Sequence, residues 1–238
     1  LGFNLRLEKF KNPKVREALS LAIDREELVK ILFFNHAKAC SGPFLPGTKA
    51  FNEDVKVPQQ NIQKAKELLK EAGYDENNPF TFEIATSNSS EIRPYAAQIL
   101  QHQLKKAGVI VTLKVMEWQA FLNMTVFPRK FDSILLGWGL SPTPDPYMFW
   151  HSQSDKKGGF NLVGYHNSQM DKMIEESQSM VDGEKLSNIW REMFKIITDD
   201  NPYLFLYIPN YITTISKEIK NVEPGPAGIW HNYIEWEK

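Results

Sequence analysis

Polar and aromatic residues that could bind a small molecule follow three segments with the pattern of β-strands. Ser87 follows the first of these segments, Trp118 follows the second, and Trp138 ends the third. In open α/β sheets, ligands bind beyond the carboxyl ends of the strands. An indole ring offers a large, rigid apolar surface with one N–H donor. We therefore expect these residues to face one cleft; the alternative is that both tryptophans belong to the core, where tryptophan is commonly found.

Residue spacings typical of catalysis or metal binding are missing from the sequence. The five histidines show neither an HxH nor an HExxH spacing, and no GxSxG, P-loop or GxGxxG motif occurs. The acidic pairs at 175–176 and 199–200 are typical of solvated helix faces. Cys40 is the single cysteine, which excludes an internal disulfide and a multi-cysteine metal site. We therefore expect no catalytic residue, no metal and no cofactor.

The composition restricts the classes of partner. Lys and Arg number 28 and Asp and Glu number 29, so the formal net charge is −1. A nucleic-acid binder needs a basic face, and docking on an anionic membrane needs basic clusters, so we expect neither partner. Hydrophobic residues make up 42% of the 238 residues, which is ordinary for one large or two small folded domains. No run approaches the roughly 20 apolar residues that a membrane span requires.

Hydrophobic periodicity and capping residues predict a series of helices. Asn12 with Pro13 begins the first, and Asp24, with an acidic residue three positions later, caps the second. The helices are expected at 13–23, 25–34, 61–72, 92–107 and 118–126, from 168 to a break at 182–183, and at 186–197. Between them, residues 36–58 and 139–162 are long irregular loops, which often carry function.

Alternating and β-branched segments predict the strands. These are expected at 80–85, 109–116, 131–138, 203–208, 211–215 and 229–236. The first two flank the helix at 92–107, and such a strand–helix–strand unit implies parallel pairing with a right-handed crossover. The expected fold class is therefore α/β, a mixed sheet flanked by helices.

Short motifs, each weak alone, occur along the chain in a fixed order. They are Asn12–Leu19 (NPKVREAL), Ala22–Arg25 (AIDR), Ala65–Tyr74 (AKELLKEAGY), Glu117–Trp118, Gly137–Trp138, Asp145–Pro146 and Gly164–Asn167 (GYHN). As a set, they resemble the family 5 extracellular solute-binding proteins, which are the oligopeptide-, dipeptide- and nickel-binding components of ABC importers. The resemblance spans nearly the whole chain.

The resemblance implies a lobe of the type II periplasmic-binding-protein fold, in which two lobes enclose a ligand cleft and hinge segments join them. Family members are longer, and this chain resembles their second half. We therefore expect a fragment of a longer protein, in keeping with a first residue, Leu1, that is not Met. Residues 1–8 would be a hinge segment from the missing lobe, residues 9–215 the ligand-binding lobe, and residues 216–238 a segment returning toward the missing lobe.

The resemblance also implies which residues bind the ligand. In peptide-binding members, the tryptophans at the positions of Trp118 and Trp138 line side-chain pockets. Tyr207 and Tyr211 fall near positions that line the cleft, and core packing is the alternative for Tyr207. With Ser87, these residues form the expected site.

Position 141 departs from the family pattern. Oligopeptide and dipeptide binders carry there an Asp that pairs with the free amine of the peptide, whereas this chain has Ser141. A hydroxyl cannot supply the charge of a carboxylate that faces an ammonium group. Either Asp145 pairs with the amine instead, or the acid comes from the missing lobe, or the ligand has no free amine. Asp145 with Pro146 also fits a simple Asp-Pro turn.

The implied function is capture without chemistry. A peptide or similar small solute would lie extended in the cleft, the lobes would close around it, and the closed form would dock on the membrane permease of an ABC importer. We expect a monomer in the periplasm or on the outer face of the cell membrane, either free or lipid-anchored. Alternative ligands within the family are an oligosaccharide or a metal chelate. Alternatives from other classes are a hydrolase, for which no nucleophile–base spacing is present, and a sensor domain that reuses the lobe.

Overall fold

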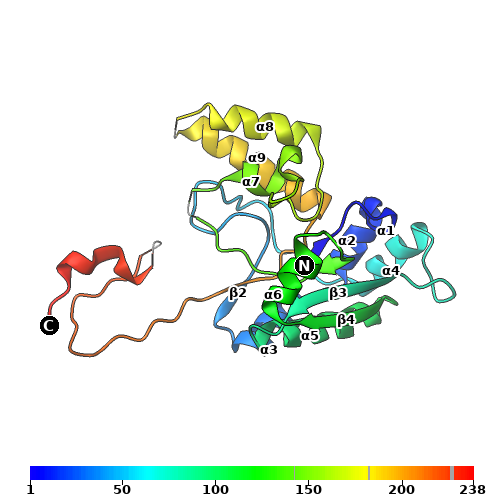
Figure 1. The fold of residues 1–238 in the computed structure, drawn as a ribbon, viewed down its shortest axis with the longest axis horizontal. Helices are drawn as coiled ribbons and strands as arrows, with labels where there is room; N and C mark the ends of the chain where they lie inside the picture. Colours follow the sequence, from blue (N-terminus) through cyan, green and yellow to red (C-terminus); the bar gives the residue numbers. More distant parts are fainter. Residues whose placement is uncertain (142, 182, 226–227) are drawn as a thin grey trace.

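A four-stranded mixed sheet carries the fold. The computed structural model describes residues 1–141, 143–181, 183–225 and 228–238. The strands are, in spatial order, β1 (Gly2–Phe3), β5 (Ser133–Ile134), β3 (Thr81–Ser87) and β4 (Ile110–Met116). β3 runs parallel to both β4 and β5, whereas β1 is antiparallel to β5 (Figure 1). The strand–helix–strand unit and the mixed α/β class expected from the sequence are confirmed.

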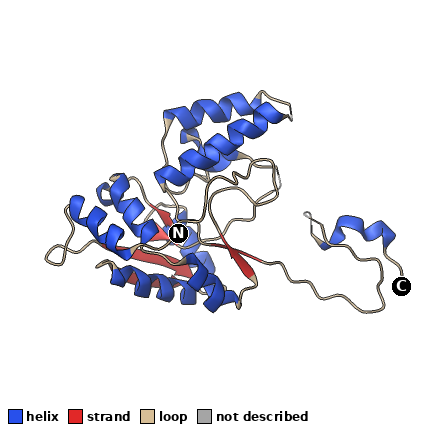
Figure 2. Ribbon diagram, turned by 180° about the vertical axis from the view of Figure 1, so that it is seen from behind, coloured by secondary structure: helices blue, strands red, loops and turns tan. Residues whose placement is uncertain are grey.

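Helices pack with this sheet to form the larger of two bodies, here called the sheet body (Figure 2). They are α1 (Glu8–Lys11), α2 (Pro13–Leu21), α3 (Arg25–Phe33), α4 (Ile62–Glu71) and α5 (Ile92–Lys106). The side-chain oxygens of Asn12, Asp24 and Asn61 each accept a hydrogen bond from a backbone N–H in the first turn of a helix, at 2.9–3.0 Å. The predicted helix starts are therefore confirmed, because these caps satisfy donors that have no partner within the helix.

Three further helices form a second body, the helical body, beside the sheet body (Figure 1). They are α7 (Pro146–Trp150), α8 (Ser168–Gln178) and α9 (Glu184–Asp200). Their apolar core includes Trp150, Met170, Ile174, Trp190 and Phe194. The helix break expected at 182–183 includes Asp182, which lies outside the described residues, as does Pro142 of the irregular segment.

A short helical stretch packs against the sheet near the carboxyl ends of its strands. It consists of α6 (Trp118–Phe121), followed by one π-helical segment, η1 (Leu122–Val126). Phe121 and Val126 are buried there with Ala85 of β3. Within the described residues, no helix is both long and apolar enough to cross a bilayer.

Two predicted strands are shorter than expected. The strand predicted at 131–138 is limited to β5, because beyond Ile134 the chain leaves the sheet. The strand predicted at 203–208 forms a ladder only at β6 (Tyr207–Pro209), which pairs antiparallel with β2 (Ala37–Ala39).

The strands predicted at 211–215 and 229–236 are wrong. Residues 211–215 form no strand, and the second segment is a 3₁₀-helix, η3 (Ile229–Glu235). This tail runs away from both bodies (Figures 1 and 2), and the side chains of Tyr211 and Ile234 are 86% and 80% exposed. A strand requires a neighbouring strand and a packed face, so β-branched and aromatic residues do not suffice.

Two buried arginines tie the sheet body to the end of α9 and to the segment that follows it. Arg16 Nε donates to the carbonyl of Asp200 at 2.8 Å. Arg25 Nε donates to the carbonyl of Phe205 at 2.7 Å, and its terminal nitrogens donate to the carbonyl and the hydroxyl of Ser20. Burial lowers the pKa of Arg25 to about 10, so this guanidinium is still charged at neutral pH. The acceptors are mostly backbone carbonyls, so the two arginines fix the path of the main chain.

Replacing Arg25 by methionine should destabilise the fold. Arg25→Met leaves the carbonyl of Phe205 and the hydroxyl of Ser20 without their donor, and an unpaired buried acceptor costs about 1–3 kcal/mol. We expect the free energy of unfolding, measured by urea denaturation, to fall by about 3 kcal/mol. Arg191 is exposed on α9, so Arg191→Met is the matched control and should change the value by less than about 0.5 kcal/mol. Equal effects of the two substitutions would contradict the role given to Arg25.

Candidate functional site

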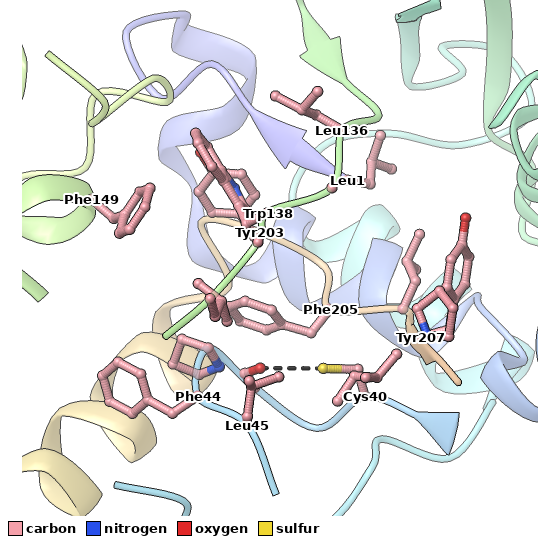
Figure 3. Close-up of a pocket in the computed structure, with 18 of the residues that line it drawn as sticks. Leu1, Cys40, Phe44, Leu45, Leu136, Trp138, Phe149, Tyr203, Phe205 and Tyr207 are labelled. Carbon is pink, nitrogen blue, oxygen red and sulfur yellow. Dashed lines mark hydrogen bonds between the residues drawn. The ribbon is translucent and has the colours of Figure 1, made fainter. Parts of the chain in front are cut away.

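A cavity of about 650 Å³, here called the pocket, lies where the sheet body meets the helical body. Figure 3 shows Phe44, Trp138, Phe149 and Phe205 around this space. Most of the lining comes from residues 40, 42–45 and 48 of the first loop, 90, 92 and 93 at the start of α5, 135–141, 143–145 and 148–150, and 203–209. These stretches are far apart in sequence, so the pocket exists only when the two bodies are assembled.

The extended segment 203–206 serves both bodies because its side chains alternate. Leu204 and Leu206 are buried in the core of the sheet body, whereas Tyr203 and Phe205 pack against the helical body. The backbone N–H of Leu204 donates to the carbonyl of Leu1 at 2.8 Å, which holds the segment extended. Successive side chains of an extended chain point to opposite sides. A single segment can therefore cover the sheet core and present aromatic rings toward the pocket.

A cluster of three rings fixes the position of Trp138. Its ring centroid lies 4.7 Å from that of Phe149 and 6.1 Å from that of Phe160, both in edge-on geometry. Phe149 and Phe160 also contact each other edge-on, at 6.4 Å. Trp138 and Phe149 line the pocket, and Phe160 supports them from outside the lining. The indole is thus held in one orientation before any ligand arrives.

Gly42 allows the first loop to reach the pocket. A Cβ atom at this position would lie 2.3 Å from the ring of Phe194 and 2.9 Å from the methyl group of Thr198. Only glycine therefore lets the loop pack so closely against α9. This approach brings Phe44 to the pocket, with its ring 6.1 Å from that of Phe194.

Arg93 supplies a positive charge to the pocket lining. Its Nη1 donates to Ser87 Oγ at 3.2 Å and to Ser89 Oγ at 2.9 Å. The guanidinium carbon lies 5.5 Å from the centre of the Trp118 ring, a distance at which a cation is attracted to the aromatic face. Ser87 is fully buried and Trp118 is half-buried; both lie behind Arg93 rather than in the lining. They position this side chain.

Ser141 and Asp145 both line the pocket and are exposed. Asp145 Oδ1 accepts a hydrogen bond from the backbone N–H of Tyr147 at 3.2 Å, and Pro146 occupies the first turn of α7. Asp145 therefore caps this short helix, which agrees with the turn role considered from the Asp-Pro pair.

The two tyrosines predicted for the cleft lie in different places. Tyr207 lines the pocket and also packs on Phe33, with ring centroids 4.8 Å apart, so it contributes both to the lining and to the core. Burial raises the pKa of Tyr207, which keeps its hydroxyl protonated at neutral pH. Tyr211 lies in the exposed tail and is not part of the lining.

Sequence reasoning misses several lining residues, namely Phe44, Arg93, Phe149, Tyr203 and Phe205. The irregular loops 36–58 and 139–162 contain Phe44 and Phe149, and aromatic residues in long loops often serve binding. The alternation within 203–208 indicates that Tyr203 and Phe205 face the same side. Arg93 has no such signal, because a basic residue near the start of a helix usually faces solvent.

The pocket has the chemistry of a binding surface. Among the described residues, no three His, Cys, Asp or Glu side chains converge as a metal site requires. The Cys40 thiol donates to the carbonyl of Gly42 at 3.2 Å. Burial raises the pKa of Cys40, so the thiol is protonated at neutral pH. The lining is mostly apolar, formed by aromatic and aliphatic side chains, and Arg93 and Asp145 add charge.

A side chain at position 42 should disturb both the loop and the fold. We expect Gly42→Ala to lower the free energy of unfolding by about 1–3 kcal/mol, since forcing extra atoms into a packed core has this typical cost. Gly139 also lines the pocket, but a Cβ atom at that position would have no heavy atom within 4 Å. Gly139→Ala is therefore the control and should stay within about 0.5 kcal/mol of the parent chain in the same urea titration.

Comparison with known proteins gives a consistent set of relatives. Residues 1–160 match the family model of bacterial extracellular solute-binding proteins, family 5, middle region. The oligopeptide-binding protein AppA of Bacillus subtilis is 32% identical to this chain, over 99% of this chain and 46% of its own length. The nickel-binding protein NikA of Staphylococcus aureus is 28% identical, over 91% of this chain and 43% of its own length.

Solved structures agree with these relatives. The structure of AppA from Bacillus subtilis in complex with a nonapeptide has a TM-score of 0.87 at 32% identity, covering 99% of this chain and 49% of that one. The periplasmic binding protein DppA from Helicobacter pylori, in complex with the peptide STSA, has a TM-score of 0.80 at 29% identity, covering 87% and 40%. The chain spans about half the length of these relatives. The expected periplasmic-binding-protein-like fold is confirmed, and the chain belongs to the family 5 bacterial extracellular solute-binding proteins.

Proposed function

We propose that this chain forms one wall of a site that captures a peptide and delivers it, chemically unchanged, to an ABC importer. The observation that carries the proposal is the aromatic pocket of about 650 Å³ between the two bodies. Ligand pockets typically enclose roughly 300–1,000 Å³ and combine apolar walls with a few polar groups. Trp138, Ser141, Asp145 and Tyr207, all in the lining, would contact the solute.

The relatives support a peptide as cargo. AppA and DppA hold a nonapeptide and a tetrapeptide, STSA, in their structures, and both align with most of this chain. A metal chelate is the second candidate, because NikA aligns over 91% of the chain.

Arg93 is suited to a carboxylate of the solute. Both of its hydrogen bonds in the described structure come from Nη1, which leaves Nη2 and Nε as donors. A guanidinium–carboxylate pair is charge-assisted and therefore stronger than a neutral hydrogen bond. The stacking of Arg93 on Trp118 would keep the group in place while the solute exchanges.

The rest of the protein would supply the opposite wall. We propose that residues 1–8 and 216–238 lead to a second lobe and that 9–215 form the ligand-binding lobe. The exposed apolar side chains of Tyr211, Trp230 and Ile234 would be buried against that lobe. The closed protein would dock as a monomer on a permease, from the periplasm or the outer membrane face, either free or on a lipid anchor.

Removing the indole at the pocket should weaken solute binding. We expect the 238-residue chain to bind members of a pentapeptide library, detected by saturation-transfer NMR, and Trp138→Ala to lower the affinity about two- to tenfold. This range corresponds to the roughly 0.5–1.5 kcal/mol of an aromatic contact. Trp230→Ala, in the exposed tail, is the matched control. Maltotriose and a nickel–histidine complex are tested in parallel, and binding of either one in place of the peptides would refute a peptide cargo.

Restoring an acid at position 141 should create a preference for a free amine. In the parent chain we expect a peptide and its N-acetylated form to bind about equally. In Ser141→Asp the free-amine form should bind about two- to fivefold tighter, the range of a solvent-exposed ion pair of about 0.5–1 kcal/mol. Ser141→Asn has nearly the same shape without the charge and should leave the ratio near one. A parent chain that already rejects the acetylated peptide would show that another acid binds the amine.

A further inference from the structure

The lining of the pocket is poor in charge. Among the lining residues that the structure describes, Arg93 and Asp145 carry the ionised side chains. Arg93 is bonded to two serine hydroxyls, and Asp145 caps α7. The rest of the polar lining consists of hydroxyl groups, the indole N–H groups of Trp138 and Trp150, the Cys40 thiol and backbone, so a cationic group of a solute would find few partners there.

The aromatic part of the lining is rigid because its rings are held by other rings. Trp138 is packed edge-on by Phe149. Trp150 contacts Tyr203 edge-on, with centroids 5.6 Å apart, and lies 6.4 Å from Phe205. All five rings belong to the lining. A preformed apolar wall of this kind loses little conformational entropy when a solute binds.

From this lining we infer that the pocket selects solutes by bulky apolar side chains and discriminates against cationic ones. The inference rests on the proposed function and names the class of peptide that the site would prefer. An apolar side chain gains free energy when it leaves water for the ring surfaces. An ammonium group in the same place would lose its hydration without gaining a partner, because the Asp145 carboxylate already accepts a hydrogen bond at the start of α7. Met148, which is 40% exposed in the lining, adds a flexible side chain that adapts to different apolar shapes.

Homotripeptides test this preference without any assumption about register, because every position carries the same side chain. The probes are tri-leucine, tri-serine and tri-lysine, titrated into the 238-residue chain while tryptophan fluorescence is recorded. Tri-leucine and tri-serine have identical backbones and terminal charges, so their ratio reports the side chain alone. We expect tri-leucine to bind at least about tenfold tighter than either of the other two.

Two variants locate the preference in the pocket. Phe149→Ala should reduce the tri-leucine to tri-serine ratio to less than about threefold. Phe127→Ala removes a half-exposed phenylalanine outside the lining and should leave the ratio unchanged. Met148→Gln is a second lining variant that keeps all the rings; it should lower the ratio even if Phe149→Ala does not fold.

Each outcome decides between the inference and the function on which it rests. Equal binding of the three peptides, or tighter binding of tri-lysine, would overturn the selectivity and leave peptide capture standing. Binding of none of them would overturn peptide capture and the selectivity with it. A preference that persists in both lining variants would show that tri-leucine binds elsewhere, for example on the exposed tail, and would overturn the assignment to the pocket.

Discussion

Buried guanidinium groups that bond to backbone carbonyls are the constraint on which the lobe depends. Arg16 and Arg25 start from α2 and α3 of the sheet body and reach the carbonyls of Asp200 and Phe205. A charged group inside a protein is costly unless its donors are satisfied. A carbonyl acceptor, unlike a mobile carboxylate on a long side chain, belongs to the main chain. The donors therefore determine where the chain must run after α9.

The pocket is a consequence of that path. Once residues 200–205 are fixed against the sheet body, the alternation of Tyr203, Leu204 and Phe205 sends one set of side chains into the sheet core and the other toward the helical body. This segment and the loop at 40–45, which Gly42 brings within contact of α9, both join the helical body to the sheet body. Binding residues in loops thus gain their positions from a rigid scaffold behind them.

Local signals predicted the parts of the fold that local interactions stabilise. The caps Asn12, Asp24 and Asn61 and the apolar periodicity of the helices are contained within a few residues, so the sequence reveals them. Strand predictions failed at 211–215 and 229–236, where the residue types are right but no neighbouring strand is available. The rule that ligands bind beyond the carboxyl ends of strands pointed to Trp138, which lines the pocket. It could not distinguish Trp138 from Trp118, because the direction of an indole depends on packing by Phe149 in one case and by Arg93 in the other.

Because position 141 holds a serine, three explanations for the amine of a peptide were considered: Asp145 binds it, an acid of the missing lobe binds it, or the solute has no amine. The contacts of Asp145 make these alternatives differ in free-energy cost. Asp145 is the nearest acid in sequence, but its carboxylate caps α7, a helix of five residues that carries Met148, Phe149 and Trp150 to the pocket. Loss of a capping side chain costs about 1 kcal/mol, and here the loss would fall on the helix that positions two rings of the lining. An ammonium group that drew Asp145 away would therefore loosen the aromatic wall that holds the rest of the solute. Recognition of the amine by an acid outside this chain, or a solute without an amine, avoids that conflict.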